Sequence, residues 1–144
     1  MNVFVFQSVP DKLNLREQDA ISEGQKDTWY ATRYRSDMKP GDIVFFWMAG
    51  DEYFRGLYGW GNIISTPYIK PGWDSHGVDV IYKCKFKKPI MARSLREDRE
   101  LSGMLIFRAP QATNFLLEAA QAKRLNRLIK DHGEITPSLE EVKR

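Results

Sequence analysis

The feature that most constrains the fold of this sequence is a strict alternation of side-chain type over residues 78–87. Every second residue is apolar (Val78, Val80, Tyr82, Cys84 and Phe86), whereas three of the five alternate positions, 83, 85 and 87, are lysines. Because successive side chains on a β-strand point to opposite faces, this pattern predicts one long strand with a buried face and an exposed face. The chain is therefore expected to build a sheet with a covered side.

Further strands are predicted over residues 3–6, 43–48, 55–65 and 104–108, with helices over 15–22 and 117–131. Gly56, Gly59 and Gly61 interrupt the third of these strands, and glycines inside a strand indicate bulges or a tightly curled sheet. Helices do not alternate with strands along the chain, which disfavours a parallel α/β sheet. We therefore predict an α+β fold, a small mixed β-barrel of about five to six strands with flanking helices.

The length of 144 residues suits a single domain, which we place at residues 1–133, followed by a C-terminal tail at 134–144. Cys84 is the only cysteine, so the chain can form neither an internal disulfide nor a cysteine-rich zinc site, as fits a reducing compartment. The N-terminus lacks a signal-peptide pattern, and the longest apolar run, residues 43–49, is too short to span a bilayer. We expect a cytoplasmic protein without a membrane segment.

No set of residues at catalytic spacing stands out in the sequence. His76 and His132 each lack a second histidine or cysteine at ligand spacing, and no phosphate-binding loop or nucleophile motif occurs. Glu97, Asp98 and Glu100 alternate with arginines, a pattern typical of a solvated, self-paired surface. We therefore predict a binding domain that is not an enzyme and that needs neither a cofactor nor a metal ion.

Residues 29–34 combine aromatic rings with a hydroxyl and a guanidinium, and Trp47 ends a predicted strand, where small barrels hold ligands. Trp29 and Trp47 together could wall a planar ring, on which stacking contributes about 1–3 kcal/mol per base. The alternative is that both indoles belong to the core. The net charge of +3 permits a polyanionic partner. The base-reading site proposed from these residues requires the two indoles to converge beside one open hollow.

Several stretches resemble the EVE domain of the PUA-like superfamily, which also includes the YTH readers of methylated adenine. They are the first strand running into Ser8-Val9-Pro10, the segments 29–34, 38–50 and 55–68, and residues 107–115. Their order from Phe4 to about Ile129 is more specific than any single piece. The sequence departs from the family pattern at Gln7 and Val9. It also has Trp47-Met48-Ala49 where other members have a tyrosine-histidine-serine type of strand end, which replaces polar groups by apolar ones.

The resemblance implies a PUA-like barrel whose pocket accepts a flipped-out base, such as methylated or hydroxymethylated cytosine or methylated adenine. It implies a nucleic-acid partner, either DNA with modified bases such as 5-methylcytosine or RNA, and a link to modification-dependent restriction through a partner nuclease. The more apolar strand end favours a bulky modification. The predicted base-binding residues are Ser8, Trp29, Tyr30, Thr32, Arg33, Trp47, Met48, Ala49, Asp51, Gln111 and Thr113.

The predicted contacts to the nucleic-acid backbone are Arg35, Arg55, Lys83 and Lys85. The strand lysines have an alternative role, because lysines on an edge strand discourage pairing with other chains. Three other functions stay open. An RNA-binding module of PUA or ASCH type would read structured RNA by shape. An interaction domain would hold a protein tail or a small metabolite, and an enzyme of nucleotide metabolism would turn over modified nucleotides.

Overall fold

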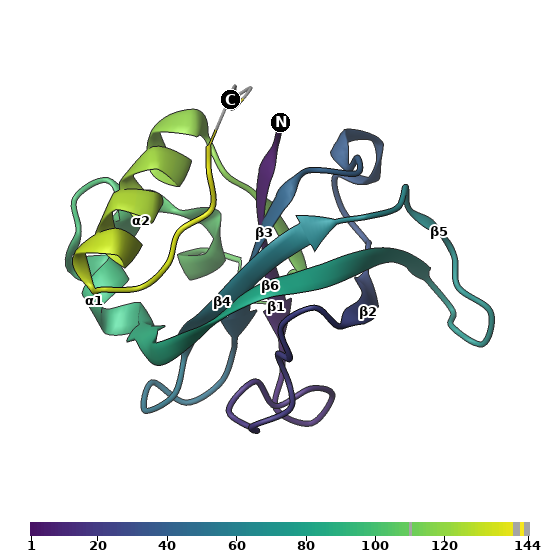
Figure 1. Cartoon of the computed structure of the whole chain (residues 1–144), viewed down its shortest axis with the longest axis horizontal. Coiled ribbons are helices and arrows are strands. Elements are labelled where there is room, and N and C mark those ends of the chain that lie inside the picture. The colour runs from purple at the N-terminus through teal and green to yellow at the C-terminus, as the bar shows by residue number, and fades with distance from the viewer. Residues whose placement is uncertain (110, 140–141, 143–144) are drawn as a thin grey trace.

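The computed structural model describes residues 1–109, 111–139 and 142, and this part of the chain forms one seven-stranded sheet with two α-helices (Figure 1). The strands are β1 (Val3–Ser8), β2 (Lys26–Tyr30), β3 (Ile43–Met48), β4 (Gly56–Ile63), β5 (Tyr68–Ile69), β6 (His76–Met91) and β7 (Asn114–Leu116). The helices are α1 (Ala92–Glu97) and α2 (Ala119–Asp131). Short 3-10 turns span Arg35–Asp37, Leu101–Gly103 and Leu105–Phe107.

The strand order is β2-β6-β4-β3-β1-β7, and β5 adds to β6. β1 and β3 are parallel and the other pairs are antiparallel, so the sheet is mixed, as predicted. The buried side chain of Asn114 on β7 reaches the far edge strand: its Nδ2 donates to Tyr30 O at 2.9 Å, and its Oδ1 accepts from Thr32 N at 2.8 Å. One side chain thus links the two edges and closes the curled sheet towards a barrel.

Both faces of the sheet are buried, and each has its own hydrophobic cluster. α1 and α2 lie on the same side of the sheet (Figure 1) and pack against side chains that include Val5, Phe45 and Trp47. The other face carries Phe4, Phe6, Trp29, Phe46 and Tyr82, and the segment 9–25 adds Leu15 and Ile21 to it. Because neighbours along a strand point to opposite faces, β1 and β3 are buried at every position.

The glycines of β4 allow β6 to approach it closely, which confirms the predicted curl of the sheet. The register between these two strands shifts between Leu57 and Gly59 and again between Trp60 and Gly61. A Cβ atom at Gly59 would overlap the carbonyl oxygen of Cys84, and one at Gly61 would overlap that of Ile81. The predicted alternation of β6 is also confirmed, because all five apolar residues are buried.

Other predicted elements differ from the structure. Residues 15–22 form turns and bends rather than a helix, because Leu15 and Ile21 each pack onto the sheet from an irregular segment. Residues 104–108 are not a strand: they continue from one 3-10 turn into the next. The strands β2, β5 and β7 and the helix α1 were not predicted. The polar strand β2 buries only Trp29, so it shows no alternation of polarity.

The segment after α2 packs against the domain in its described residues. The carboxylate of Glu134 accepts from Lys87 N at 2.9 Å and from Lys88 N at 3.1 Å. Trp60 Nε1 donates to Ile135 O at 3.0 Å. Leu139 and Val142 contact the cluster under the helices. In the described part of the chain, no helix has the length and apolarity that a membrane crossing requires.

Candidate functional site

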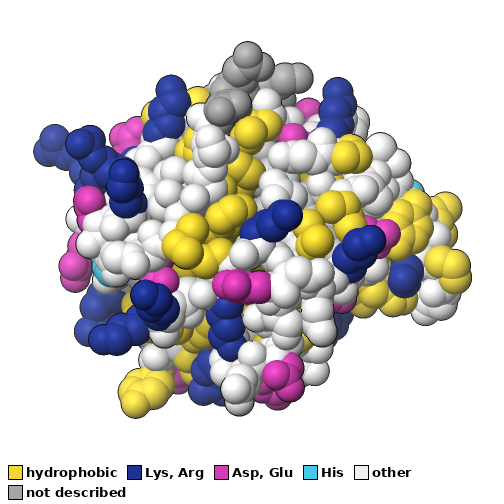
Figure 2. All heavy atoms as spheres, in the orientation of Figure 1, with side chains coloured by type: hydrophobic (Ala, Val, Ile, Leu, Met, Phe, Trp, Pro, Cys, Tyr) yellow, Lys and Arg dark blue, Asp and Glu magenta, His cyan; other side chains and the backbone are white. Residues whose placement is uncertain are grey.

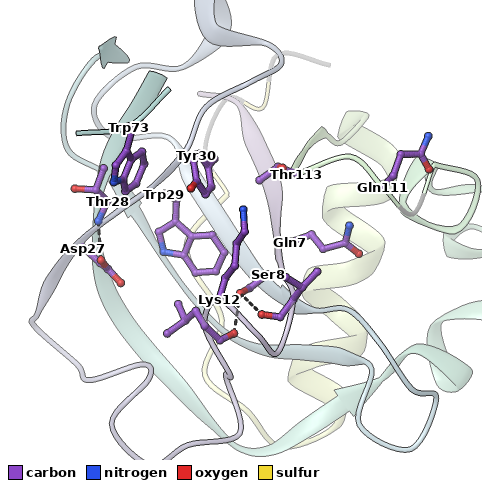
Figure 3. A pocket seen from close by; sticks show the side chains of 12 residues that line it. Gln7, Ser8, Lys12, Asp27, Thr28, Trp29, Tyr30, Trp73, Gln111 and Thr113 are labelled. Carbon is purple, nitrogen blue, oxygen red and sulfur yellow. Dashed lines mark hydrogen bonds between the residues drawn. The ribbon is translucent and has the colours of Figure 1, made fainter. Parts of the chain in front are cut away.

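A hollow of about 560 Å³ opens beside β2, within the volume range of pockets that hold small ligands (Figure 3). Its walls come from the end of β1 and the segment after it, from β2, from the turn before β6 and from the segment before β7. The lining residues are Gln7, Ser8, Val9, Lys12, Leu13, Asp27, Thr28, Trp29, Tyr30, Trp73, Gln111 and Thr113. Segments that are far apart in the sequence meet at this hollow, because β1 and β2 end at the same part of the curled sheet.

The indole of Trp29 forms the back of the hollow and is only 6% exposed. Its ring lies 5.1 Å from Phe46 and 6.3 Å from Phe6, measured between ring centroids. Its Nε1 donates to the hydroxyl of Tyr82 at 3.0 Å. Packing on one side and a hydrogen bond at the ring edge fix the orientation of this indole, so it offers a rigid flat surface.

At the Nε1 edge of Trp29, the hydroxyl of Tyr82 donates to Asp27 Oδ2 at 2.6 Å. Thr28 N donates to the other carboxylate oxygen at 2.8 Å. Burial raises the pKa of Tyr82, and the hydrogen bond to the Asp27 carboxylate raises it further. The phenol therefore stays protonated at neutral pH and remains a donor to Asp27, while its oxygen accepts from Trp29.

Two further rings form a side wall near the mouth. Tyr30 and Trp73 pack with ring centroids 4.6 Å apart and planes inclined by 35°. Lys12 crosses the hollow from the segment after β1 (Figure 3), and its Nζ lies 4.7 Å from the centroid of Tyr30. Beside this wall, Ile69 is 73% exposed, and Figure 2 shows hydrophobic side chains gathered at the end of the molecule that β5 forms.

The polar groups at the end of β1 hold the rim in place. Ser8 Oγ donates to Leu13 O at 2.7 Å. Gln7 Nε2 donates to Ala112 O at 2.6 Å, and Gln7 N donates to Thr113 O at 2.8 Å. These bonds fix the segment after β1 and the segment before β7 to the end of β1, where both line the hollow.

The structure brings together five of the predicted base-binding residues, namely Ser8, Trp29, Tyr30, Gln111 and Thr113. The expectation that Trp29 and Trp47 converge is wrong, so the base-reading site that was predicted from these two indoles is not formed. Trp47 is fully buried in the cluster under the helices, with its ring 5.8 Å from Phe107, and it does not line the hollow. Trp47 follows Phe46, whose side chain packs on Trp29, so the alternation of the strand directs Trp47 to the opposite face.

The other predicted base-binding residues also lie outside the lining. Met48 is buried in the cluster that contains Trp29, and Ala49 follows it at the end of β3. The Asp51 carboxylate accepts from Tyr53 N at 2.8 Å within its own loop. Thr32 Oγ1 bonds Asn114 Oδ1 at 3.3 Å, and the Arg33 guanidinium lies 5.3 Å from the ring of Tyr34.

The residues of the hollow that sequence reasoning missed are Gln7, Val9, Lys12, Leu13, Asp27, Thr28 and Trp73. Asp27 stands two residues before Trp29, so recognising β2 as a strand would have placed both on one face. Trp73 lies in a segment predicted as a loop, and only the pairing of β5 with β6 brings it to Tyr30.

Among the predicted backbone-binding cations, Lys83 is exposed, and Arg35 is exposed although its Nη1 donates to Ala31 O at 3.4 Å and to Thr32 O at 3.3 Å. Arg55 and Lys85 are less exposed and are engaged within the fold. Arg55 Nη2 donates to Ile106 O at 3.2 Å, and its guanidinium lies 5.5 Å from the ring of Trp47. Lys85 Nζ donates to Glu17 O at 3.2 Å and Gln18 O at 2.9 Å. These two side chains hold loops against the sheet, on surfaces away from the hollow's lining.

The charges of residues 96–100 pair with other segments, which corrects the predicted self-paired surface. Arg96 forms an ion pair with Glu52, and Asp98 Oδ2 lies 2.6 Å from Arg124 Nη2 on α2. Across the residues that the structure describes, no group of three or more His, Cys, Asp or Glu side chains could hold a metal ion.

The curled mixed sheet with helices on one side is that of a PUA-like domain. The chain belongs to the EVE domain family, whose model matches residues 2–128. A comparison with curated proteins finds no match.

Solved structures share this fold at low sequence identity. A hypothetical protein from Leishmania major has a TM-score of 0.72 at 17% identity, covering 93% of this chain and 98% of the other. Human THYN1 protein, solved with DNA containing 5-methylcytosine, has a TM-score of 0.69 at 17% identity, with coverages of 89% and 97%. The YTH domain of the Zygosaccharomyces rouxii MRB1 protein, solved with N6-methyladenosine RNA, has a TM-score of 0.54 at 15% identity, with coverages of 99% and 89%.

Proposed function

We propose that this domain reads nucleic acid by accepting a flipped, modified base into the hollow beside β2. The observation that carries this proposal is a rigid indole at the back of the hollow, Trp29, with the Tyr30–Trp73 pair at its side. A flat ligand that enters can stack on aromatic surface and present its edge to polar groups. The structures of the human and yeast relatives with 5-methylcytosine DNA and N6-methyladenosine RNA support the same class of ligand.

The energetics of this mode are balanced. Removing a base from a duplex costs a few kcal/mol. Stacking on aromatic rings contributes about 1–3 kcal/mol per base, and hydrogen bonds to the base edge add to it. Stacking on the aromatic walls of the hollow can therefore offset the free-energy cost of flipping the base. The hydrogen bonds to the base edge then determine which base binds most tightly.

Phosphates next to a flipped base require cations at the mouth of the hollow. We propose Lys12 and Lys70 for this role: Lys12 lies against Tyr30, and Lys70 Nζ lies 5.9 Å from the ring of Trp73. Arg35, which follows β2, and the exposed Lys83 on β6 remain predicted backbone contacts. The net charge of +3 favours such an encounter at low ionic strength.

Binding without turnover is the activity that we propose, with no cofactor. In a modification-dependent restriction system, cleavage would come from a separate nuclease partner that this domain directs to modified sites. An in vitro pull-down with candidate nucleases on modified and plain DNA would test that link, and recruitment that is equal on both DNAs would contradict it.

The proposed function is tested by fluorescence anisotropy with labelled duplexes that differ at one central base. The panel comprises cytosine, 5-methylcytosine, 5-hydroxymethylcytosine, adenine and N6-methyladenine, each in DNA and in RNA. We expect at least one modified base to bind at least tenfold more tightly than its plain counterpart, and the better backbone identifies the natural partner. Equal affinity for every base would contradict the proposal, and preference for structured RNA regardless of base would favour recognition by shape instead.

A further inference from the structure

We propose that Asp27 reads the exocyclic amino group of the bound base, so that the hollow selects amino-bearing bases over their keto counterparts. This inference rests on the proposed function and names the ligand class of the same site. Cytosine-type and adenine-type bases carry the amino group, whereas thymine and hypoxanthine carry a carbonyl oxygen at the equivalent position.

The position of Asp27 follows from β2. Asp27 and Trp29 are two residues apart on this strand, so both side chains lie on the same face, and both line the hollow (Figure 3). The intervening Thr28 side chain bonds Asp79 on β6 instead, at 2.7 Å. The Tyr82 hydroxyl accepts from Trp29 Nε1 and donates to Asp27, so it links the Nε1 edge of the indole to the carboxylate.

The Asp27 carboxylate is held but not saturated. One oxygen accepts from Tyr82 and the other from Thr28 N, as described above. Two carboxylate oxygens offer about four acceptor positions, so each oxygen can accept a further hydrogen bond. In the described part of the chain, no lysine or arginine forms an ion pair with Asp27. A donor from the ligand is the group that this carboxylate lacks.

The chemistry of a carboxylate determines that an amino group is preferred over a carbonyl oxygen. A carboxylate accepts hydrogen bonds and donates none, so it pairs with an N–H group and repels a carbonyl oxygen. A polar site that matches one edge discriminates strongly against an edge that leaves its groups unpaired. The carboxylate also repels phosphate, which favours its use on a base edge and leaves the phosphates to Lys12 at the mouth.

The test uses two pairs of bases that differ at the amino position, 5-methylcytosine with thymine and adenine with hypoxanthine. Each base is placed opposite an abasic site in a DNA duplex and in an RNA duplex, so that no base pair has to break before binding. We expect the wild-type protein to prefer the amino base of at least one pair by about ten- to a hundredfold. A duplex with 5-methyl-2-pyrimidinone, which lacks the amino group, should bind as weakly as thymine.

The variant Asp27→Asn should bring this preference close to one, because an amide can donate to a carbonyl oxygen as well as accept. Asp79→Asn is the matched control: Asp79 lies on β6, outside the lining of the hollow, and accepts hydrogen bonds from Thr28 Oγ1 and Tyr68 Oη. It should keep the wild-type preference. Thermal unfolding of both variants establishes that they are folded at the assay temperature.

The outcomes separate the inference from the function on which it rests. If the wild type distinguishes modified from plain bases but Asp27→Asn keeps the amino preference, the role of Asp27 is overturned and the reader function stands. Equal binding of amino, keto and 2-pyrimidinone bases by the wild type overturns the role of Asp27 without any variant. Loss of all base dependence, across this panel and the modified panel, overturns both.

Discussion

Tyr30 and Trp73 pack against each other across the end of β6, with 4.6 Å between their ring centroids. Tyr30 pairs with Gly77 from one side of β6, and Tyr68 of β5 pairs with the same glycine from the other side. A Cβ at Gly77 would lie 3.2 Å from Trp73 Cζ3, so the glycine leaves room for the indole. The side wall of the hollow therefore depends on the turn between β5 and β6 staying docked on β2.

Replacing Trp73 with alanine should weaken binding of the preferred modified base by roughly ten- to a hundredfold, because one stacking surface contributes about 1–3 kcal/mol. The half-buried turn position of Trp73 makes the loss of stability small. Trp47→Phe is the control: this indole lies in the other cluster, and its buried Nε1 has no hydrogen-bond partner among the described residues. Anisotropy titrations should show unchanged base preference for Trp47→Phe, and a change there would place the base elsewhere.

Removing a positive charge at the mouth of the hollow should lower the affinity for all nucleic-acid sequences equally. Lys12→Ala is expected to lower affinity for modified and plain duplexes by the same factor and to reduce the slope of log K against log salt by about 0.9. Arg35→Ala and Lys83→Ala test the predicted backbone contacts in the same titration and should each reduce the slope similarly. The control is Lys123→Ala, an exposed position on α2, on the helical side of the sheet. A Lys12 variant that alters base preference but not the slope would contradict the assignment.

The close approach of β4 and β6 gives a stability prediction. Gly61→Ala forces a Cβ against the carbonyl oxygen of Ile81 and should lower the free energy of unfolding by about 1–3 kcal/mol, as overpacking does. Gly103→Ala is the matched control, since a Cβ there meets nothing within 4 Å. Urea unfolding followed by circular dichroism measures both. Equal midpoints for the two variants would argue against the close pairing of these strands.

The ion pair between Asp98 and Arg124 of α2 predicts that the stability of the fold decreases at acid pH. The hydrogen bond from Arg124 lowers the pKa of Asp98 below its ordinary value of 3.8. Because the folded-state pKa is depressed, the stabilisation is present above the unfolded pKa and is lost as the pH falls through the folded pKa. Asp98→Asn should therefore be less stable than the wild type at pH 7, with the difference shrinking as the pH falls below 3.8.

Denaturant midpoints measured from pH 7 down to acid pH would check this prediction. Asp74→Asn serves as the control, because Asp74 is exposed and belongs to no ion pair in the described residues. A constant difference between Asp98→Asn and the wild type across the whole range would contradict the linkage.

The parts of the fold that the sequence could predict are those with periodic polarity. β3 is a run of buried residues after a Pro-Gly turn and α2 has an apolar stripe, so both were predicted with nearly their observed bounds. β6 was predicted over residues 78–87, where its polarity alternates, but it extends over His76–Met91. Short strands at the sheet edges carry no such pattern. β2 has one buried residue and β7 has three residues in all, and tertiary contacts decide their structure.

The candidate site was predictable where it coincides with the family pattern and not where it depends on three-dimensional register. Ser8 and Trp29 were predicted and line the hollow. Trp47 was placed in the hollow because it ends a strand. Successive residues of a strand point to opposite faces, and Phe46 points to the face that carries Trp29, so Trp47 points to the other face. Trp73 was missed because its approach depends on the pairing of β5, which the sequence does not show.

Strand β1 lies between β3 and β7, so its backbone groups find all their partners only when a segment more than a hundred residues later has arrived. A chain emerging from the ribosome can pair β1 with β3 early, but the other side of β1 stays an open strand edge, apolar from Val3 to Phe6, until residues 114–116 leave the exit tunnel. Completion of the fold is therefore expected late in translation, and truncated chains that stop before β7 should aggregate rather than remain as smaller folded domains.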